Sequence, residues 1–203
     1  MMARTGRRPG NVDTRAQILA VARAHFAELG YDGVSLRGIA RTAGVDPALL
    51  HHYFAGKSAL FAEVMQLPVD PAVALPMALR GPLEGLGERL VRFFLGLWES
   101  PDTRPQMLTW FRSSLATEEG AQRLREFVTR EVLSRVIAAV PAEQRSPRRT
   151  ALVGAHLAGL GVGRYLIRLG PLAEATVDQL VADVGPVLQH YLIAPLPDED
   201  GLA

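Results

Sequence analysis

Apolar residues in this chain recur at intervals of three and four, and no segment shows sustained alternation of apolar and polar residues. The first spacing places side chains on one face of an α-helix, whereas alternation is typical of a half-buried strand. Gly, Pro and helix-capping residues separate the successive runs. We therefore expect an all-α protein.

The first third of the chain carries the clearest helix signals. We expect helices over residues 13–29, 35–43 and 46–54, and a fourth that begins near Lys57. Ser35 and Asp46 are candidate N-caps, and Pro47 follows Asp46 at the first helical position, where its missing N–H costs nothing. Gly30 and Gly44 allow the chain to end one helix and turn toward the next.

A segment rich in Pro and Gly, residues 68–87, is the clearest boundary in the sequence. We expect a flexible basic arm over residues 1–12, a first domain over 13–66 and a larger helical domain over 67–203. In the larger domain we expect helices at about 86–99, 103–117, 118–140, 147–169 and 175–192.

Composition and charge narrow the class of protein. Of the 203 residues, 48% are hydrophobic, which is too many for a disordered chain. The absence of cysteine excludes disulfide scaffolds, thiol catalysis and cysteine-based zinc sites. Residues 1–57 contain seven Arg and one Lys against four acidic residues, whereas the remainder is slightly acidic. This asymmetry favours contact with a polyanion near the N-terminus, although chance scatter of charge gives the same pattern.

Neither the N-terminus nor the apolar segments carry the pattern of a targeting signal. Arg4, Arg7 and Arg8 are not followed by an apolar region, so a secretory signal is not expected. The longest apolar stretch, residues 151–163, is interrupted by His156 and is too short to span a bilayer. We expect a soluble cytoplasmic protein that does not bind a membrane.

The two short helices joined at Gly44 form a helix–turn–helix pattern, which by itself is a moderate signal. The surrounding residues 14–65 are far more specific and resemble the DNA-binding domain of the tetracycline-repressor (TetR) family. The matching pieces are Ile18–Leu19, Ala22, Phe26, Gly30–Tyr31, Ser35 to Ala40, Ala43–Gly44–Val45, Leu50 to Phe54, Lys57 and Leu60. The family usually has Tyr where this chain has His51.

The resemblance implies a homodimer that binds double-stranded operator DNA, with each recognition helix in a major groove. The candidate groove residues are Asp46, Pro47, Ala48, His51 and His52, with Tyr53 beside them. Lys57 falls on the family's phosphate-contacting lysine, and Ser35, Leu36 and Arg37 fall where the preceding helix approaches the DNA backbone. Arg7 and Arg8 of the arm are candidates for the minor groove, although an unstructured tail would look the same. Asp46 repels phosphate, so its role is either a helix cap or an acceptor for a cytosine amino group.

The resemblance also implies that the larger domain binds a small molecule and dimerises through its last two long helices. The candidate pocket residues are Phe93, Phe94, Trp98, Met107, Trp110, Phe111, Phe127 and His156. They indicate a small apolar or aromatic effector, but an aromatic stripe at helical spacing is also what a plain core looks like. The candidate dimerisation residues are Ala155, Gly159, Gly163, Val177, Leu180, Val184 and Leu188, although a monomeric core could pack in the same way.

The sequence carries no motif typical of catalysis or of cofactor or metal binding: no HExxH, GxSxG, P-loop or dinucleotide fingerprint occurs. We expect no enzyme activity, no cofactor and no metal. The sequence favours a repressor that a small-molecule effector releases from DNA. It leaves open a regulator without small-molecule input and one tuned by a protein partner. A helical module that has lost DNA binding is disfavoured by the basic first part of the chain and by Lys57.

Overall fold

The computed structural model describes residues 10–196, with side chains from residue 14 onward, and within that range the chain forms helices and no strand. The all-α prediction is confirmed. The chain divides between Leu67 and Pro68 into two compact units, which are described separately.

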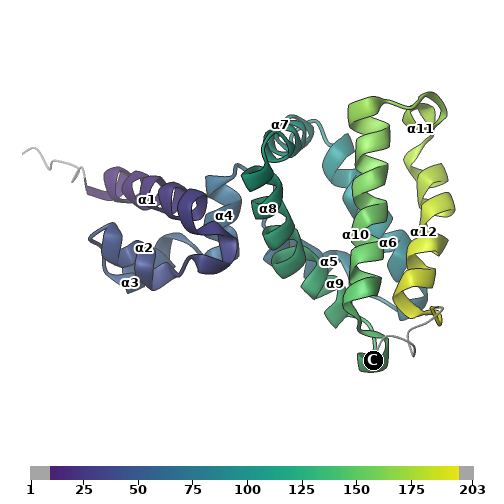
Figure 1. Ribbon diagram of the computed structural model, residues 1–203, viewed down its shortest axis with the longest axis horizontal. Coiled ribbons are helices and arrows are strands. Elements are labelled where there is room, and N and C mark those ends of the chain that lie inside the picture. The colour runs from purple at the N-terminus through teal and green to yellow at the C-terminus, as the bar shows by residue number, and fades with distance from the viewer. Residues whose placement is uncertain (1–9, 197–203) are drawn as a thin grey trace, which may run out of the picture. The chain divides into compact units, whose positions relative to one another are not determined.

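The first unit contains α1 (Gly10–Gly33), α2 (Leu36–Thr42), α3 (Pro47–Tyr53) and α4 (Lys57–Val64), shown in purple and blue in Figure 1. Helix α1 begins at Gly10, so residues 10–12, expected in the arm, are helical; Arg7 and Arg8 lie outside the described residues. Gly30 interrupts α1 with a φ of 67°, a left-handed value that favours glycine.

An aromatic group holds the first unit together. The rings of Phe26 and Tyr31 each meet the ring of Phe61 edge-on, at centroid distances of 4.9 and 5.0 Å. Ile39 of α2 and Leu50 of α3 are fully buried beside this core. Full burial of such a side chain contributes about 1.5–3 kcal/mol, so the inner faces of α2 and α3 fix how these two short helices are presented.

The second unit contains eight α-helices and two π-helical segments among the residues described. They are α5 (Pro71–Ala78), α6 (Leu86–Glu99), α7 (Arg104–Leu115), α8 (Glu118–Phe127), η2 (Val128–Leu133), α9 (Ser134–Ala138), α10 (Pro147–Gly161), η4 (Val162–Ile167), α11 (Gly170–Glu174) and α12 (Val177–Ile193). Two short helices, α5 and α11, were not predicted. Helix α5 lies in the Pro- and Gly-rich segment and is capped by Asp70, which accepts from the Ala72 N–H at 2.9 Å.

Helices α6 and α12 run side by side because glycines allow their backbones to touch (Figure 1). A Cβ at Gly87 of α6 would collide with the carbonyl oxygen of Gly185 and lie 2.6 Å from the amide nitrogen of Gln189. A Cβ at Gly185 would lie 3.0 Å from the Cα of Glu88. Real Cβ atoms do not come as close to backbone as the one at Gly87 would, so that position requires glycine, and at Gly185 a Cβ would force Glu88 to shift.

The side chain of Gln189 completes this contact. Its Oε1 accepts from the Gly87 N–H at 2.8 Å, and its Nε2 donates to the Leu83 carbonyl at 2.8 Å. The first N–H groups of a helix have no partner within the helix. Helix α12 therefore supplies the cap for the N-terminus of α6 as well as the surface against which α6 packs.

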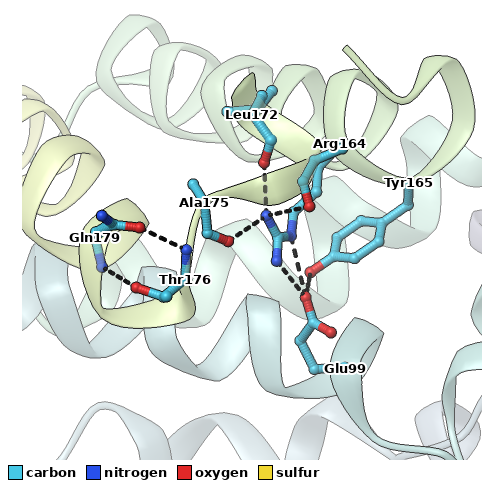
Figure 2. A network of polar contacts seen from close by, with 8 residues as sticks. Glu99, Arg164, Tyr165, Leu172, Ala175, Thr176 and Gln179 are labelled. Carbon is cyan, nitrogen blue, oxygen red and sulfur yellow. Dashed lines mark hydrogen bonds and ion pairs between the residues drawn. The ribbon is translucent and has the colours of Figure 1, made fainter. Parts of the chain in front are cut away.

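A buried arginine joins α6 to the segment before α12 (Figure 2). Arg164 of η4 donates to Oε1 of Glu99 from Nε at 3.0 Å and from Nη2 at 2.8 Å. Its Nη1 donates to the carbonyls of Leu172 and Ala175 at 2.6 and 2.8 Å. The Tyr165 hydroxyl donates to the same Glu99 oxygen at 2.9 Å. We call Glu99, Arg164 and Tyr165 the Arg164 network.

The Arg164 network shifts the pKa values of its members. Burial raises the pKa of Glu99, but hydrogen bonds from Arg164 and Tyr165, together with the Arg164 charge, outweigh burial and hold that pKa below its ordinary value of 4.5. Burial and the hydrogen bond to Glu99 raise the pKa of Tyr165. At neutral pH Glu99 is therefore a carboxylate and Tyr165 is a neutral donor.

Helix α10 and η4 form one continuous helix, Pro147–Ile167, of 21 residues. Its most apolar window has a mean hydropathy of 1.2, so among the described helices it is the one long and apolar enough to cross a membrane. The apolar stretch of residues 151–163 is thus part of a longer helix, which lies within the range of about 147–169 expected from the sequence. One such helix is weak evidence for a membrane span, since core helices of soluble proteins pass the same test.

The α6–α12 contact predicts opposite effects for two substitutions within α6. Gly87→Ala should lower the free energy of unfolding by about 1–3 kcal/mol, because the new methyl group overpacks a backbone contact. Gly96→Ala is the matched control: its Cβ would meet nothing within 4 Å, so it should raise stability by about 0.5–1 kcal/mol. Urea denaturation measures both, and equal effects would contradict the assigned contact.

The Arg164 network predicts pH-dependent stability. At neutral pH, Glu99→Gln should lower the free energy of unfolding by about 1.5–3 kcal/mol, because charged hydrogen bonds are lost. Since the folded-state pKa is depressed, this stability exists above the ordinary pKa and disappears as pH falls through the folded-state value. Denaturation of both proteins from about pH 7 to pH 3 should show the difference narrowing.

Asp178→Asn is the control for this series, because Asp178 forms an exposed ion pair with Arg92 at 2.7 Å. Exposed pairs contribute about 1 kcal/mol at most. A difference between wild type and Glu99→Gln that stays constant with pH would contradict the role of the carboxylate.

Candidate functional site

Helices α2 and α3 form the helix–turn–helix, and local interactions define both ends of the turn. Ser35 accepts from the Gly38 N–H at 3.1 Å, and Asp46 accepts from the Ala48 N–H at 2.7 Å. Gly44, with a φ of 66°, makes the turn between them. The cap role of Asp46 is thereby confirmed, and Gln17 of α1 donates to the Ala43 carbonyl at 2.9 Å, which ties α1 to the turn.

The predicted DNA-contacting residues lie largely on the surface of the first unit. Leu50 points inward and is fully buried, whereas His51 and His52 of the same helix are exposed. The other exposed members of the set are Ser35, Arg37, Asp46, Pro47 and Ala48. Leu36, Tyr53 and Lys57 are half-buried. The outer face of α3 is therefore polar and free of core contacts at His51 and His52.

Lys57 is the first residue of α4, and its ammonium lies over the ring of Tyr31, 4.5 Å from the centroid. Tyr31 is itself buried in the aromatic core of the first unit. The attraction between an ammonium and an aromatic face restrains an otherwise flexible side chain. The single lysine of this chain is thus held at the start of a helix.

In the second unit, most of the predicted pocket residues come together as one group of rings. Trp98 meets Phe94 and Phe111 at 6.1 and 5.7 Å, and Trp110 meets Phe111 and Phe127 at 6.4 and 6.1 Å. Tyr165, which sequence reasoning missed, stacks on Trp98 at 4.8 Å with an interplanar angle of 3°. We call Phe94, Trp98, Trp110, Phe111, Phe127 and Tyr165 the aromatic cluster.

Three predicted pocket residues lie outside this cluster as defined. Met107 is buried on α7, and Phe93 is half-buried on α6. His156 contacts α12 instead: its ring lies 4.9 Å from the ring of Tyr191, and its Nδ1 is 3.1 Å from the Leu152 carbonyl oxygen. Its assignment to the pocket is not supported by these contacts.

The predicted dimerisation residues separate into two groups. Ala155 and Gly159 of α10 are exposed, and Val177 and Val184 of α12 are half-buried. Leu180 and Leu188 are buried within the protomer, and a Cβ at Gly163 would lie 2.9 Å from Leu172. Leu180 and Leu188 belong to the protomer core, because α12 packs its apolar face against other helices of its own unit, and Gly163 of η4 is buried against Leu172.

Sequence reasoning also missed Glu99 and Arg164 as members of a polar network. The available signal was Arg164 itself, since a charge within an otherwise apolar helix is buried only when it is paired. The partner could not be identified from the sequence, because Glu99 is 65 residues away.

Comparison with known proteins identifies both units. Residues 18–64 match the family model for bacterial regulatory proteins of the tetR family, and residues 84–192 match the model for the tetracyclin repressor-like C-terminal domain. The HTH-type transcriptional regulator BetI of Agrobacterium fabrum is 29% identical over 174 residues, covering 81% of this chain and 84% of the relative. BetI of Rhizobium meliloti is 30% identical over 145 residues, which is 70% of each chain.

Among solved structures, a TetR-family regulator from Streptomyces coelicolor A3 is 37% identical and aligns with a TM-score of 0.50. The alignment covers 92% of this chain and 98% of that one. Members of this family bind operator DNA and form dimers. The two matched models, the length of the similarity and the helix–turn–helix together show that this chain belongs to the TetR family of bacterial transcriptional regulators.

Proposed function

We propose that the protein is a homodimeric repressor that binds operator DNA and is released when a small apolar or aromatic molecule binds its second unit. The observation that carries the DNA-binding part is the outer face of α3, where His51 and His52 are exposed while Leu50 anchors the helix. Imidazole nitrogens can donate to or accept from base edges. We assign the protein no catalytic activity, and we place it in the cytoplasm with its DNA.

The proposed DNA contacts divide by role. Asp46, Pro47, Ala48, His51 and His52 would read bases in the major groove, with Tyr53 beside them. Ser35, Leu36, Arg37 and Lys57 would lie against the backbone, and Lys57 would supply a positive charge to a phosphate. Arg7 and Arg8 lie outside the described residues, and their proposed minor-groove contact rests on the sequence alone.

The proposed dimer surface consists of the exposed faces of α10 and α12. Ala155 and Gly159 are exposed on α10, and Ala182 and Val187 are exposed on α12. Glycine within a helix costs about 1 kcal/mol relative to alanine. A Cβ at Gly159 would meet nothing within the protomer, so its own fold does not require glycine there. Close approach of a helix from a second subunit would account for it.

Control by a ligand requires that binding change the affinity for DNA. A dimer reads two half-sites about 34 Å apart, so any change in the separation of its two α3 helices weakens binding. The alternative is a regulator without small-molecule input, for which the complete burial of Trp98 among the other rings is the supporting observation. In that alternative no small molecule releases the DNA.

A phosphate contact by Lys57 predicts the effect of two substitutions at one position. Lys57→Ala should weaken binding to all DNA sequences and lower the slope of log affinity against log salt by about 1, because one counterion fewer is released. Lys57→Arg keeps the charge and is the matched control, with a slope close to that of wild type. Fluorescence anisotropy over a salt series measures both. Weakened binding to only some operator variants would contradict a phosphate contact.

The proposed dimer surface predicts that Ala155→Arg separates the subunits. In a twofold interface each new guanidinium is desolvated without a partner, so the dimer dissociation constant should rise about a hundredfold or more. Ala116→Arg, an equal change at an exposed position after α7, is the control. Sedimentation equilibrium gives the mass, and circular dichroism checks the fold. A stable Ala155→Arg dimer would place the interface elsewhere.

A further inference from the structure

Two buried indole N–H groups in the aromatic cluster have no hydrogen-bond partner within the described part of the chain. They belong to Trp98, which is fully buried, and to Trp110, which is 9% exposed. Buried tryptophans usually donate this hydrogen bond, and an unmade one leaves the desolvation penalty of the donor uncompensated. A pair of unsatisfied donors in one cluster is therefore a feature that a plain core would avoid.

Each indole contacts an aromatic ring that lies in, or directly before, a π-helical segment. Phe127, which packs on Trp110, is followed directly by the π-helical segment η2. Tyr165, which stacks on Trp98, lies within the π-helical segment η4. Segments of π-helix are rare and occur frequently at functional sites. Two of them beside two unsatisfied donors point to a site that accepts an occupant.

The charged residues around the aromatic cluster indicate whether the occupant carries a charge. Arg164 donates all three of its nitrogens to Glu99 and to backbone carbonyls, and Glu99 accepts from both Arg164 and Tyr165. Arg149, the other buried charge of the second unit among the described residues, donates to the Tyr191 carbonyl at 2.9 Å. Arg104 of α7 is exposed, and its guanidinium carbon lies over the ring of Tyr165, 5.8 Å from the centroid. The buried charged groups near the cluster are thus already engaged, whereas buried neutral donors are left over.

From these observations we infer that the effector is a neutral, largely apolar molecule with a hydrogen-bond acceptor, such as a carbonyl or ether oxygen, that accepts from the indole N–H of Trp98 or Trp110. This inference rests on the proposed control by a small molecule and specifies its ligand. An acceptor at Trp98 would also press on the stacked Tyr165 ring. The Arg164 network links that ring to Glu99 of α6 and, through Arg164, to the segment before α12.

The chain offers a direct reporter, because it contains two tryptophans and both are in the cluster. A ¹⁵N-labelled sample therefore gives two indole N–H resonances. The probes are four phenyl compounds: acetophenone, α-methylstyrene, phenyltrimethylammonium and benzoate. Acetophenone and α-methylstyrene have the same shape, and only the first carries an acceptor oxygen.

We expect acetophenone to bind about five- to tenfold more tightly than α-methylstyrene, the ratio that one net hydrogen bond supplies. It should move at least one indole proton downfield. If the binding site offered no hydrogen-bond donor, α-methylstyrene would bind more tightly than acetophenone. The acetophenone carbonyl would then lose its hydrogen bonds to water without gaining one from the protein. Trp98→Phe and Trp110→Phe keep an aromatic ring and remove the N–H, and at least one of them should abolish the preference.

Three results would overturn the inference: binding of α-methylstyrene as tight as that of acetophenone, preference for either charged probe, or unchanged indole resonances with all four probes at their solubility limits. Adding the same probes to the protein–DNA complex tests the proposed function separately. Acceptor-dependent binding without release of DNA would support the ligand class and contradict control by ligand. Release of DNA by α-methylstyrene alone would support control by ligand and contradict the proposed ligand class.

Discussion

The second unit depends on a backbone contact between α6 and α12 that glycine alone permits. Gly87 and Gly185 bring the two helices so close that a methyl group on either would meet main-chain atoms. Gln189 then caps α6 from α12. This contact uses one face of α12 entirely within the protomer, burying Leu180 and Leu188, and leaves Ala182 and Val187 exposed for a partner. The inner packing thus determines which surface a dimer can use.

The Arg164 network has the same role at the other end of these helices. Arg164 fixes the segment that leads into α12 through two carbonyls, and it is neutralised by Glu99 of α6. Because Tyr165 belongs both to this network and to the aromatic cluster, a change at Trp98 is mechanically connected to α12. A ligand in the cluster would act on the element that carries the proposed dimer surface, which is the connection that an effector-controlled regulator needs.

Local rules made the first unit predictable. Caps and turns are decided by neighbouring residues, so the roles of Ser35, Asp46 with Pro47, and Gly44 follow from the sequence around them. In the second unit, the sequence predicts where most helices lie but not which face of each helix is buried. Leu188 and Val187 are both apolar, and only packing within the protomer decides that the first is buried and the second exposed. The Glu99–Arg164 pair and the π-helical segments likewise arise from contacts between distant parts of the chain, which periodicity does not record.

Sequence-specific DNA binding is the property on which the proposed function depends. The most direct test is fluorescence anisotropy of the full-length protein with DNA from the region upstream of its own coding sequence, against a scrambled duplex, over a salt series. We predict tight binding to the natural DNA, at a palindromic site that matches a twofold dimer, with affinity that falls steeply as salt rises. Failure to bind either duplex even at low salt would contradict it and would leave a helical module that has lost DNA binding.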